Sequence, residues 1–185
     1  PTHSTSSAAS DVYKRQMFEE AAQETGIEKN LLAAISFQES QWDPRAQSDL
    51  GVRGMMMVTL ETAALVGVEK RLNPEQNIKG GAKYFAMLKE KNIVGKTDAD
   101  QLSTVLASYN LGPTNINKIA SQINSDVQTV SWTEIREKLK VIKGSELNLV
   151  DRESYSRGQQ AIDYVDRVNS YYQLLSAHSC IAPKD

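Results

Sequence analysis

The sequence predicts an all-α protein, and three observations lead to that prediction. Apolar residues recur at helical spacing along most of the chain, as in Ile27, Leu31 and Ile35. Helix start signals recur too, since Asn73-Pro74-Glu75 combines a cap residue, a first-turn proline and an acid. No segment shows sustained two-residue alternation of apolar and polar residues together with an enrichment in β-branched residues, so little sheet is expected.

These signals place about seven to eight helices along the chain. A first helix is expected over residues 17–25, and Thr25 with Glu28 has capping-box spacing for a second that reaches Glu39. Thr59 should cap a brief helix that stops before Gly67, and Asn73 should open one that runs to about residue 91. Further helices are expected over residues 99–110, 114–123, 131–139 and 157–176, with a long loop over residues 141–156.

Length and composition favour one domain with a real core, because the chain has 185 residues, of which 40% are hydrophobic. A formal net charge of −2 gives no electrostatic case for nucleic acid. The single cysteine, Cys180, and the two histidines, His3 and His178, lie near the chain ends. They leave no disulfide framework, histidine triad or metal cluster to expect, so no metal or cofactor is predicted. No apolar run is long enough to cross a bilayer, and no signal-peptide core is present.

Residues 1–16, PTHSTSSAASDVYKRQ, match nothing expected of the domain. They look like translated adapter sequence of the kind found on fragmentary reading frames. We therefore set them aside as a non-native segment, disordered unless contacts order it, and assign the domain to residues 17–185.

Glu39 is the carboxylate whose position most suggests chemistry. It follows Ile35 at an interval of four, so it shares the face of the helix that should be buried, on the last helical turn. Burial and the negative end of the helix dipole both disfavour a charged carboxylate, and a general acid needs the raised pKa that results. The glycine-punctuated loop of residues 48–54 leads into Met55, Met56 and Met57 and is expected to fold back as a cleft wall.

Three separated motifs carry a resemblance to a known family. The first joins FQESQWDP at residues 37–44 to GVRGMMM at residues 51–57; the second is ASYNLG at residues 107–112; the third is Tyr164-Val165. In this order they resemble the soluble-lytic-transglycosylase-like domain of the goose-type lysozyme superfamily, in its F-type membrane-bound branch. Most members carry a glutamine where Met57 stands here. The resemblance implies a lysozyme-like fold around a glycan-binding cleft.

The resemblance also implies a reaction for Glu39. It would protonate the oxygen between N-acetylmuramic acid and N-acetylglucosamine, then take the proton of the muramoyl 6-hydroxyl as a 1,6-anhydro ring closes. One carboxylate suffices, because the substrate supplies its own nucleophile, whereas ordinary glycosidases need two. Asp43 precedes proline and is expected to turn the chain. Asp49 is the acid that could instead make the protein a two-carboxylate hydrolase.

Supporting roles follow from the same resemblance, each with a structural alternative. Ser48 would reach the substrate or act as a turn hydroxyl, and Met56 would line the cleft or fill the core. Tyr109 would lie on the cleft, ordered by Asn110. Tyr164 would point its hydroxyl at Glu39 or be a core aromatic.

Two further residues of the first motif each have a functional and a structural interpretation. Trp42 could stack on a sugar or plug the core. Arg53 could meet peptide carboxylates or cap the loop.

The partner expected from the resemblance is the peptidoglycan strand, with the protein a monomer in the periplasm, associated with the outer membrane. F-type relatives carry an N-terminal domain similar to solute-binding proteins, so we expect the sequence in hand to be the catalytic half of such a protein. Two other functions remain open: a non-catalytic glycan-binding module and a muramidase-type hydrolase. The products of digested peptidoglycan would separate the three.

Overall fold

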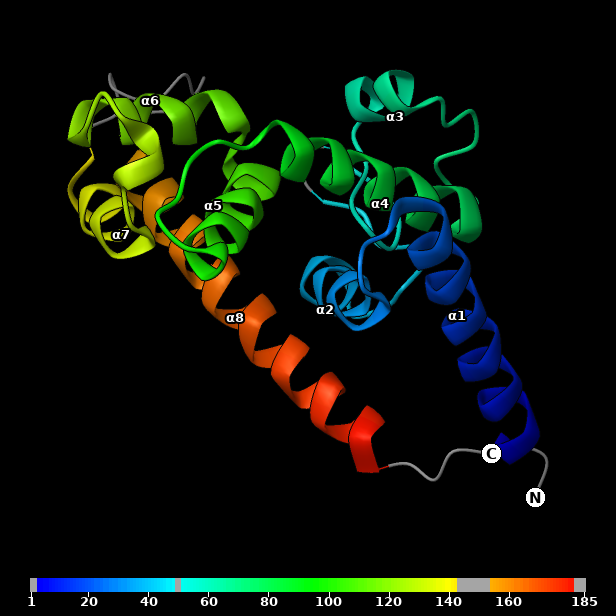
Figure 1. Ribbon diagram of the computed structural model, residues 1–185. Helices are drawn as coiled ribbons and strands as arrows, with labels where there is room; N and C mark the ends of the chain where they lie inside the picture. The colour runs from blue at the N-terminus through cyan, green and yellow to red at the C-terminus, as the bar shows by residue number, and fades with distance from the viewer. Residues whose placement is uncertain (1–2, 49–50, 143–153, 182–185) are drawn as a thin grey trace. The chain divides into compact units, whose positions relative to one another are not determined.

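The computed structural model describes residues 3–48, 51–142 and 154–181, and these residues form eight α-helices and one 3₁₀ helix. The helices of the first half are α1 (His3–Thr25), α2 (Lys29–Ser40), α3 (Leu60–Val66) and α4 (Pro74–Lys91). Those of the second half are α5 (Asp98–Leu111), α6 (Pro113–Ile123), η1 (Val127–Thr129), α7 (Trp132–Val141) and α8 (Ser154–Ile181). Within the described ranges no strand forms, and β-pairing is limited to the isolated bridges Gln47–Arg53 and Arg53–Val58. The all-α prediction is confirmed (Figure 1).

The chain divides into two compact units. Unit 1 comprises residues 1–86 and 168–185, and unit 2 comprises residues 87–167. The helices α4 and α8 each contribute residues to both units. Each unit has buried apolar residues of its own.

In unit 1, α2 supplies the centre of the apolar core. Leu32, Ala34 and Ile35 are fully buried there, as the spacing of apolar residues in the sequence predicts. From α4, Ile78, Ala82 and Phe85 are fully buried as well.

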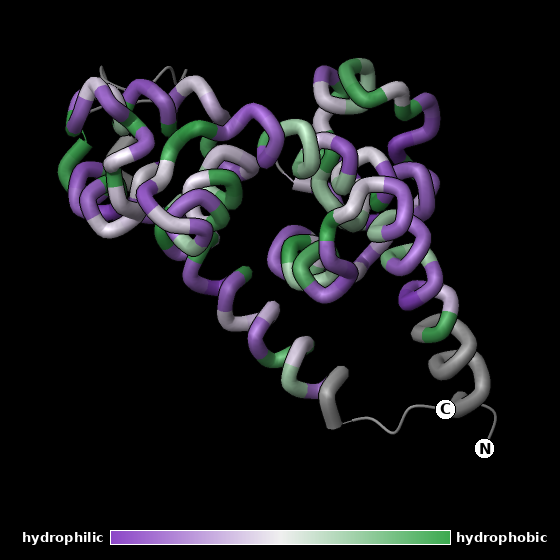
Figure 2. Tube along the Cα trace, in the orientation of Figure 1, coloured by the Kyte–Doolittle hydropathy of each residue, from purple (hydrophilic) through white to green (hydrophobic). Residues whose placement is uncertain are grey.

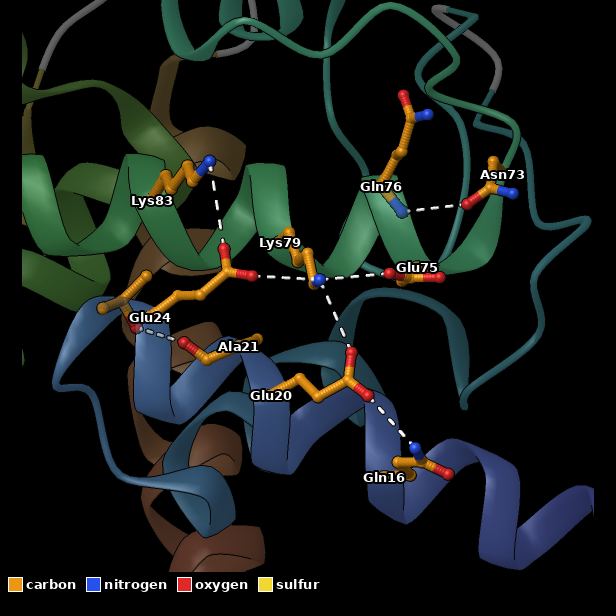
Figure 3. Close-up of polar contacts among 10 residues, drawn as sticks. Gln16, Glu20, Ala21, Glu24, Asn73, Glu75, Gln76, Lys79 and Lys83 are labelled. Atoms are coloured by element: carbon orange, nitrogen blue, oxygen red, sulfur yellow. Dashed lines mark hydrogen bonds and ion pairs between the residues drawn. The ribbon is translucent and has the colours of Figure 1, made fainter.

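An ion-pair cluster joins α1 to α4 on the surface of unit 1 (Figure 3). The Nζ of Lys79 lies 2.9 Å from Glu24, 3.0 Å from Glu75 and 3.4 Å from Glu20. The hydrogen bonds to Glu24 and Glu75 hold the pKa of Lys79 well above its usual value. Lys79 is therefore the cation that holds three carboxylates of two helices together.

In unit 2, α5, α6 and α7 pack against one another. Capping boxes open two of these helices: Thr97 with Asp100 at α5, and Ser131 with Glu134 at α7. The backbone N–H of Trp132 donates to Asp100 over 2.8 Å, so the starts of α5 and α7 are tied together.

The α7–α8 contact of unit 2 is close and polar at one point. Arg136 on α7 makes two 2.8 Å hydrogen bonds to the carboxylate of Asp166 on α8. A Cβ on Gly158 would lie 2.3 Å from the carbonyl oxygen of Leu139, so the two backbones can approach only because residue 158 is glycine.

Several helix starts confirm the sequence predictions. Thr59 accepts a hydrogen bond from Thr62 N–H, Asn73 accepts one from Gln76 N–H, and the Ser131 capping box forms. A Cβ on Gly80 of α4 would lie 2.6 Å from Cγ2 of Val68, so that side chain packs directly against the helix backbone.

The capping box expected at Thr25 and Glu28 does not form. Thr25 ends α1 instead, where its hydroxyl donates to Ala21 carbonyl over 2.7 Å. Glu28 is the N-cap residue of α2, yet its side chain makes no capping hydrogen bond. The Glu28 carboxylate instead accepts a hydrogen bond from the Tyr172 hydroxyl, and this bond raises the pKa of Tyr172.

The first helix is longer than expected, since α1 begins at His3 and runs through the segment set aside from the domain. Most of the loop expected over residues 141–156 lies outside the described residues. Apolar and polar segments alternate along the helices of both units, as Figure 2 shows. Along the described ranges no helix is both long and apolar enough to span a bilayer.

Candidate functional site

Glu39 lies on the last turn of α2, one residue before the helix ends at Ser40, and is partly buried. Pro44 alone would end the helix before Asp43. The helix already ends at Ser40, two residues earlier, because Gln41 and Trp42 both have left-handed backbone conformations, with φ of 53° and 62°. Non-glycine residues adopt this region at a cost, so two in succession form an enforced turn directly behind the carboxylate.

Trp42 shows how that turn is held. Its indole Nε1–H donates to the carbonyl of Ala33 over 2.9 Å, and its ring packs edge-on against Phe37 at 4.9 Å. Phe37 also meets Tyr171 of α8 edge-on at 4.7 Å. These contacts favour the structural alternative for Trp42, an aromatic residue that closes the end of α2, over a sugar-stacking one.

Asp43 has the turn role expected of it. Its Oδ1 accepts a hydrogen bond from the backbone N–H of Arg45 over 2.9 Å, and the residue is exposed. Asp49, the carboxylate that a hydrolase would need, lies outside the described residues.

The methionine segment is fastened to the turn that carries Glu39. The hydroxyls of Ser36 and Ser40, which flank Glu39 on α2, both donate to the carbonyl of Met55, over 2.9 and 2.8 Å. Met55 and Met56 are fully buried. The methionine segment that follows the loop is therefore bonded to the end of α2, while a cleft wall formed by residues 48–54 stays a prediction.

Met56 and Ser48 are placed by contacts that fit their structural alternatives. The side chain of Met56 is 0% exposed, as a core residue would be. The Ser48 hydroxyl accepts from Val52 N–H over 3.2 Å, as a turn hydroxyl does. A sugar contact by either residue stays a prediction.

Arg53 also has a structural place, since its backbone bridges to Gln47 on one side and to Val58 on the other. Its carbonyl accepts a hydrogen bond from the side chain of Asn77. A role for its guanidinium toward peptide carboxylates stays a prediction.

Sequence reasoning missed Asn77 and Arg71, which hold the same segment from α4 and the loop before it. Asn77 is fully buried and hydrogen-bonds to the backbone of Arg53, Met56 and Arg71. The Arg71 guanidinium donates to the carbonyls of Gly51 and Val58. A signal for Asn77 was available, because it lies four residues before Gly81 and eight before Phe85, on the buried stripe of its helix.

The other predicted site residues belong to unit 2. Tyr109 is partly buried and Asn110 exposed, both in the last turn of α5, which is followed by the C-cap residue Gly112 with φ of 92°. Behind that end, the amide of Asn115 donates to Leu111 carbonyl over 2.8 Å. Tyr164 on α8 is buried, with 4% of its surface exposed.

The structure therefore groups the predicted residues into two sets. Glu39, Ser48 and Met56 lie in unit 1, while Tyr109, Asn110 and Tyr164 lie in unit 2. The predicted contact between Tyr164 and Glu39 stays a prediction. Among the described residues, no group of three or more His, Cys, Asp and Glu side chains is arranged to hold a metal ion.

Comparisons with known proteins agree with the motifs. The membrane-bound lytic murein transglycosylase F 1 of Alkalilimnicola ehrlichii is 42% identical over 164 residues, which is 87% of this chain and 33% of that protein. The membrane-bound lytic murein transglycosylase F of Aeromonas hydrophila is 39% identical over 80% of this chain and 30% of its own length. This chain thus spans about a third of the curated relatives that it matches.

Solved structures show the same fold at lower identity. An inactive mutant of the lytic transglycosylase Slt from Pseudomonas aeruginosa superposes with a TM-score of 0.64 at 20% identity. The match covers 92% of this chain and 25% of that one. The 70 kDa soluble lytic transglycosylase of Escherichia coli gives a TM-score of 0.59 at 18% identity, over 87% of this chain and 24% of its own. The lysozyme-like prediction is thereby confirmed.

The family model for the transglycosylase SLT domain matches residues 16–129, which is more than half of the chain and includes Glu39, Ser48, Met56, Tyr109 and Asn110. This chain belongs to the transglycosylase SLT domain family.

Proposed function

We propose that this chain is the catalytic part of a peptidoglycan lytic transglycosylase. It would cleave the β-1,4 bond between N-acetylmuramic acid and N-acetylglucosamine and leave a 1,6-anhydromuramoyl end. Family membership supports the reaction class, and the curated relatives are named lytic murein transglycosylases.

The observation that carries the proposal is the setting of Glu39. It is partly buried on the last turn of α2, where the negative end of the helix dipole favours a neutral carboxyl group. The serines on either side of it bind the methionine segment, so the turn that presents the carboxyl group is fixed. A fixed acid that can hold its proton is what general acid catalysis requires.

The chemistry balances with one carboxyl group. Glu39 gives its proton to the glycosidic oxygen as the bond from that oxygen to C1 of the muramoyl unit breaks. The oxygen of the muramoyl 6-hydroxyl then bonds to C1, and its proton passes to the Glu39 carboxylate. The acid is regenerated, and no water is consumed.

We assign supporting roles to residues of both units as part of the proposal. Ser48 reaches toward the glycan, Met56 lines the cleft beside the sugar, Tyr109 lies on the cleft and is ordered by Asn110, and the Tyr164 hydroxyl orients Glu39. The buried position of Tyr164 and the partial burial of Tyr109 are compatible with these roles.

Location and partners follow from the same proposal. The relatives are named membrane-bound, so we place the protein in the cell envelope, in the periplasm and associated with the outer membrane. We propose that the unit acts as a monomer on peptidoglycan strands. The relatives' additional length leaves room for a regulatory domain similar to solute-binding proteins.

Mass spectrometry of digested peptidoglycan sacculi tests the proposal. The expected products are muropeptides with 1,6-anhydromuramoyl ends, which are lighter by one water than their reducing counterparts. Reducing ends would instead identify a muramidase-type hydrolase. Binding without any product would identify a glycan-binding module.

A further inference from the structure

A single peptide group between Met55 and Met56 is bound at both of its polar atoms. Its carbonyl oxygen accepts hydrogen bonds from Ser36 and Ser40 of α2. Its N–H donates to Oδ1 of Asn77 on α4 over 2.8 Å. The orientation of this one peptide plane therefore links the end of α2 to α4 within unit 1.

Asn77 is suited to hold that plane in one orientation. Its Nδ2 donates to the carbonyls of Arg53 and Arg71, over 2.9 and 2.8 Å, while its Oδ1 accepts from Met56. A flipped amide would set Oδ1 against two carbonyl oxygens and Nδ2 against an N–H, so only one orientation satisfies all three partners. Because Asn77 is 0% exposed, water does not readily replace these hydrogen bonds.

The backbone around Asn77 leaves it no room to move. A Cβ on Gly54 would lie 2.3 Å from Nδ2 of Asn77, so the loop passes directly over the amide. Gly54 has φ of 87° and Met57 has φ of 47°, which shows a tightly turned segment on both sides of the held peptide.

We propose that Asn77 is a positioning residue for the transglycosylase reaction. It acts through the Met55–Met56 peptide and the hydroxyls of Ser36 and Ser40 to fix the helical turn that presents Glu39. This inference rests on the proposed function and adds to it a residue that touches neither substrate nor reacting atoms.

The first test is Asn77→Ala, measured with a soluble glycan substrate at a temperature where the variant is folded by circular dichroism. A displaced acid costs rate rather than affinity, so kcat should fall by roughly 10²-fold while KM changes little. Asn92→Ala is the matched control. That asparagine also holds a turn through its side-chain amide, but its partners Val94 and Thr104 belong, like Asn92 itself, to unit 2. Its kcat should stay near that of the unchanged protein.

A second measurement does not depend on activity. In the unchanged protein the Met56 amide should exchange slowly with solvent, and in Asn77→Ala its exchange should accelerate, whereas in Asn92→Ala it should not. If Asn77→Ala fails to fold, the double variant Ser36→Ala/Ser40→Ala releases the carbonyl side of the same peptide and should show the same fall in kcat.

Unchanged kcat in a folded Asn77→Ala protein would overturn the proposal, as would an equal loss in Asn92→Ala. Unchanged kcat in the double serine variant would overturn it when Asn77→Ala does not fold. Failure of the proposed function looks different, because the unchanged protein would then form no anhydromuramoyl ends at all.

Discussion

Two glycines of one loop have similar backbone angles but different surroundings. Gly51 has φ of 74° with open space where a Cβ would stand, and Gly54 has φ of 87° with Asn77 at 2.3 Å. A larger residue at position 51 would therefore face backbone strain alone, whereas one at position 54 would also clash with the buried amide of Asn77.

We expect Gly54→Ala to be the more destabilising of the two substitutions. Overpacking beside Asn77 adds about 1–3 kcal/mol to the strain of a left-handed alanine, which by itself costs about 1–2 kcal/mol. Urea unfolding of Gly54→Ala and Gly51→Ala measures the difference directly. Equal losses of unfolding free energy would mean that the segment moves away from Asn77 at no cost.

At the scale of residues, the sequence located Glu39 but not the groups that fix it. Its interval of four from Ile35 and the motif around it were both visible in the chain. The hydrogen bonds from Ser36 and Ser40 to Met55 were not visible, because a serine near the end of a helix gives no sequence signal for a partner 15 to 19 residues away. Met56 and Ser48 show a different limit of the sequence. Their motif was visible, but a motif does not tell whether a side chain faces a ligand or the protein's own core.

At the scale of elements, local capping signals predicted the starts of α3, α4 and α7. They failed at Thr25, because α1 continues to that residue and uses its hydroxyl before α2 begins. They missed the capping box of Thr97 and Asp100 that opens α5, because the usual capping-box pattern has Glu or Gln where Asp100 stands. A capping pattern shows which groups can bond locally, and the preceding helix decides whether they are available.

The cap at Asp100 gives a prediction about pH. Burial alone would raise the pKa of this carboxyl group, but hydrogen bonds from Trp132 N–H and from Thr97 outweigh burial and leave the pKa below its usual 3.8. The folded state then binds the proton less readily than the unfolded chain, so this stabilisation is complete above the unfolded value and is lost as pH falls through the folded one.

Thermal unfolding between pH 7 and pH 2.5 measures that loss. Asp100→Asn cannot titrate, so its stability should fall less steeply below about pH 4 than that of the unchanged protein. Asp98→Asn, in the same helical turn, serves as the control and should keep the steep fall. Parallel curves for Asp100→Asn and the unchanged protein would remove Asp100 from this role.

The α1–α4 ion-pair cluster predicts a response to salt. Lys79→Met leaves Glu20, Glu24 and Glu75 close together without their shared cation. Because the Lys79 side chain is 24% exposed, we expect a loss of about 1 kcal/mol in unfolding free energy at low salt. The loss should shrink in 1 M NaCl, where the screening length is about 3 Å.

Lys83→Met is the matched control for this measurement. Lys83 is more exposed and reaches Glu24 only at 3.9 Å, so its removal should cost less than half as much. A loss for Lys79→Met that does not depend on salt would show that its aliphatic stem, rather than its charge, joins the two helices.

At the scale of the whole molecule, the fold class followed from periodicity and the family followed from three motifs in order. What could not be predicted is the division into two units, with the predicted site residues distributed between them. Sequence spacing cannot show such a division, because α4 and α8 run through both units with uninterrupted helical patterns.

The chain spans about a third of its curated relatives, yet it holds every residue to which the proposed reaction assigns a role.

The most direct test replaces Glu39 by glutamine, which keeps its size but removes the titrating proton. Glu39→Gln should still bind insoluble peptidoglycan in a co-sedimentation assay, while its release of anhydromuramoyl products should fall by at least the roughly 10²–10⁴-fold of general acid–base catalysis. Asp43→Asn, which keeps the turn hydrogen bond to Arg45, should retain full activity. Undiminished release of anhydromuramoyl products by a folded Glu39→Gln protein would contradict the claim that one carboxyl group on the last turn of α2 moves both protons.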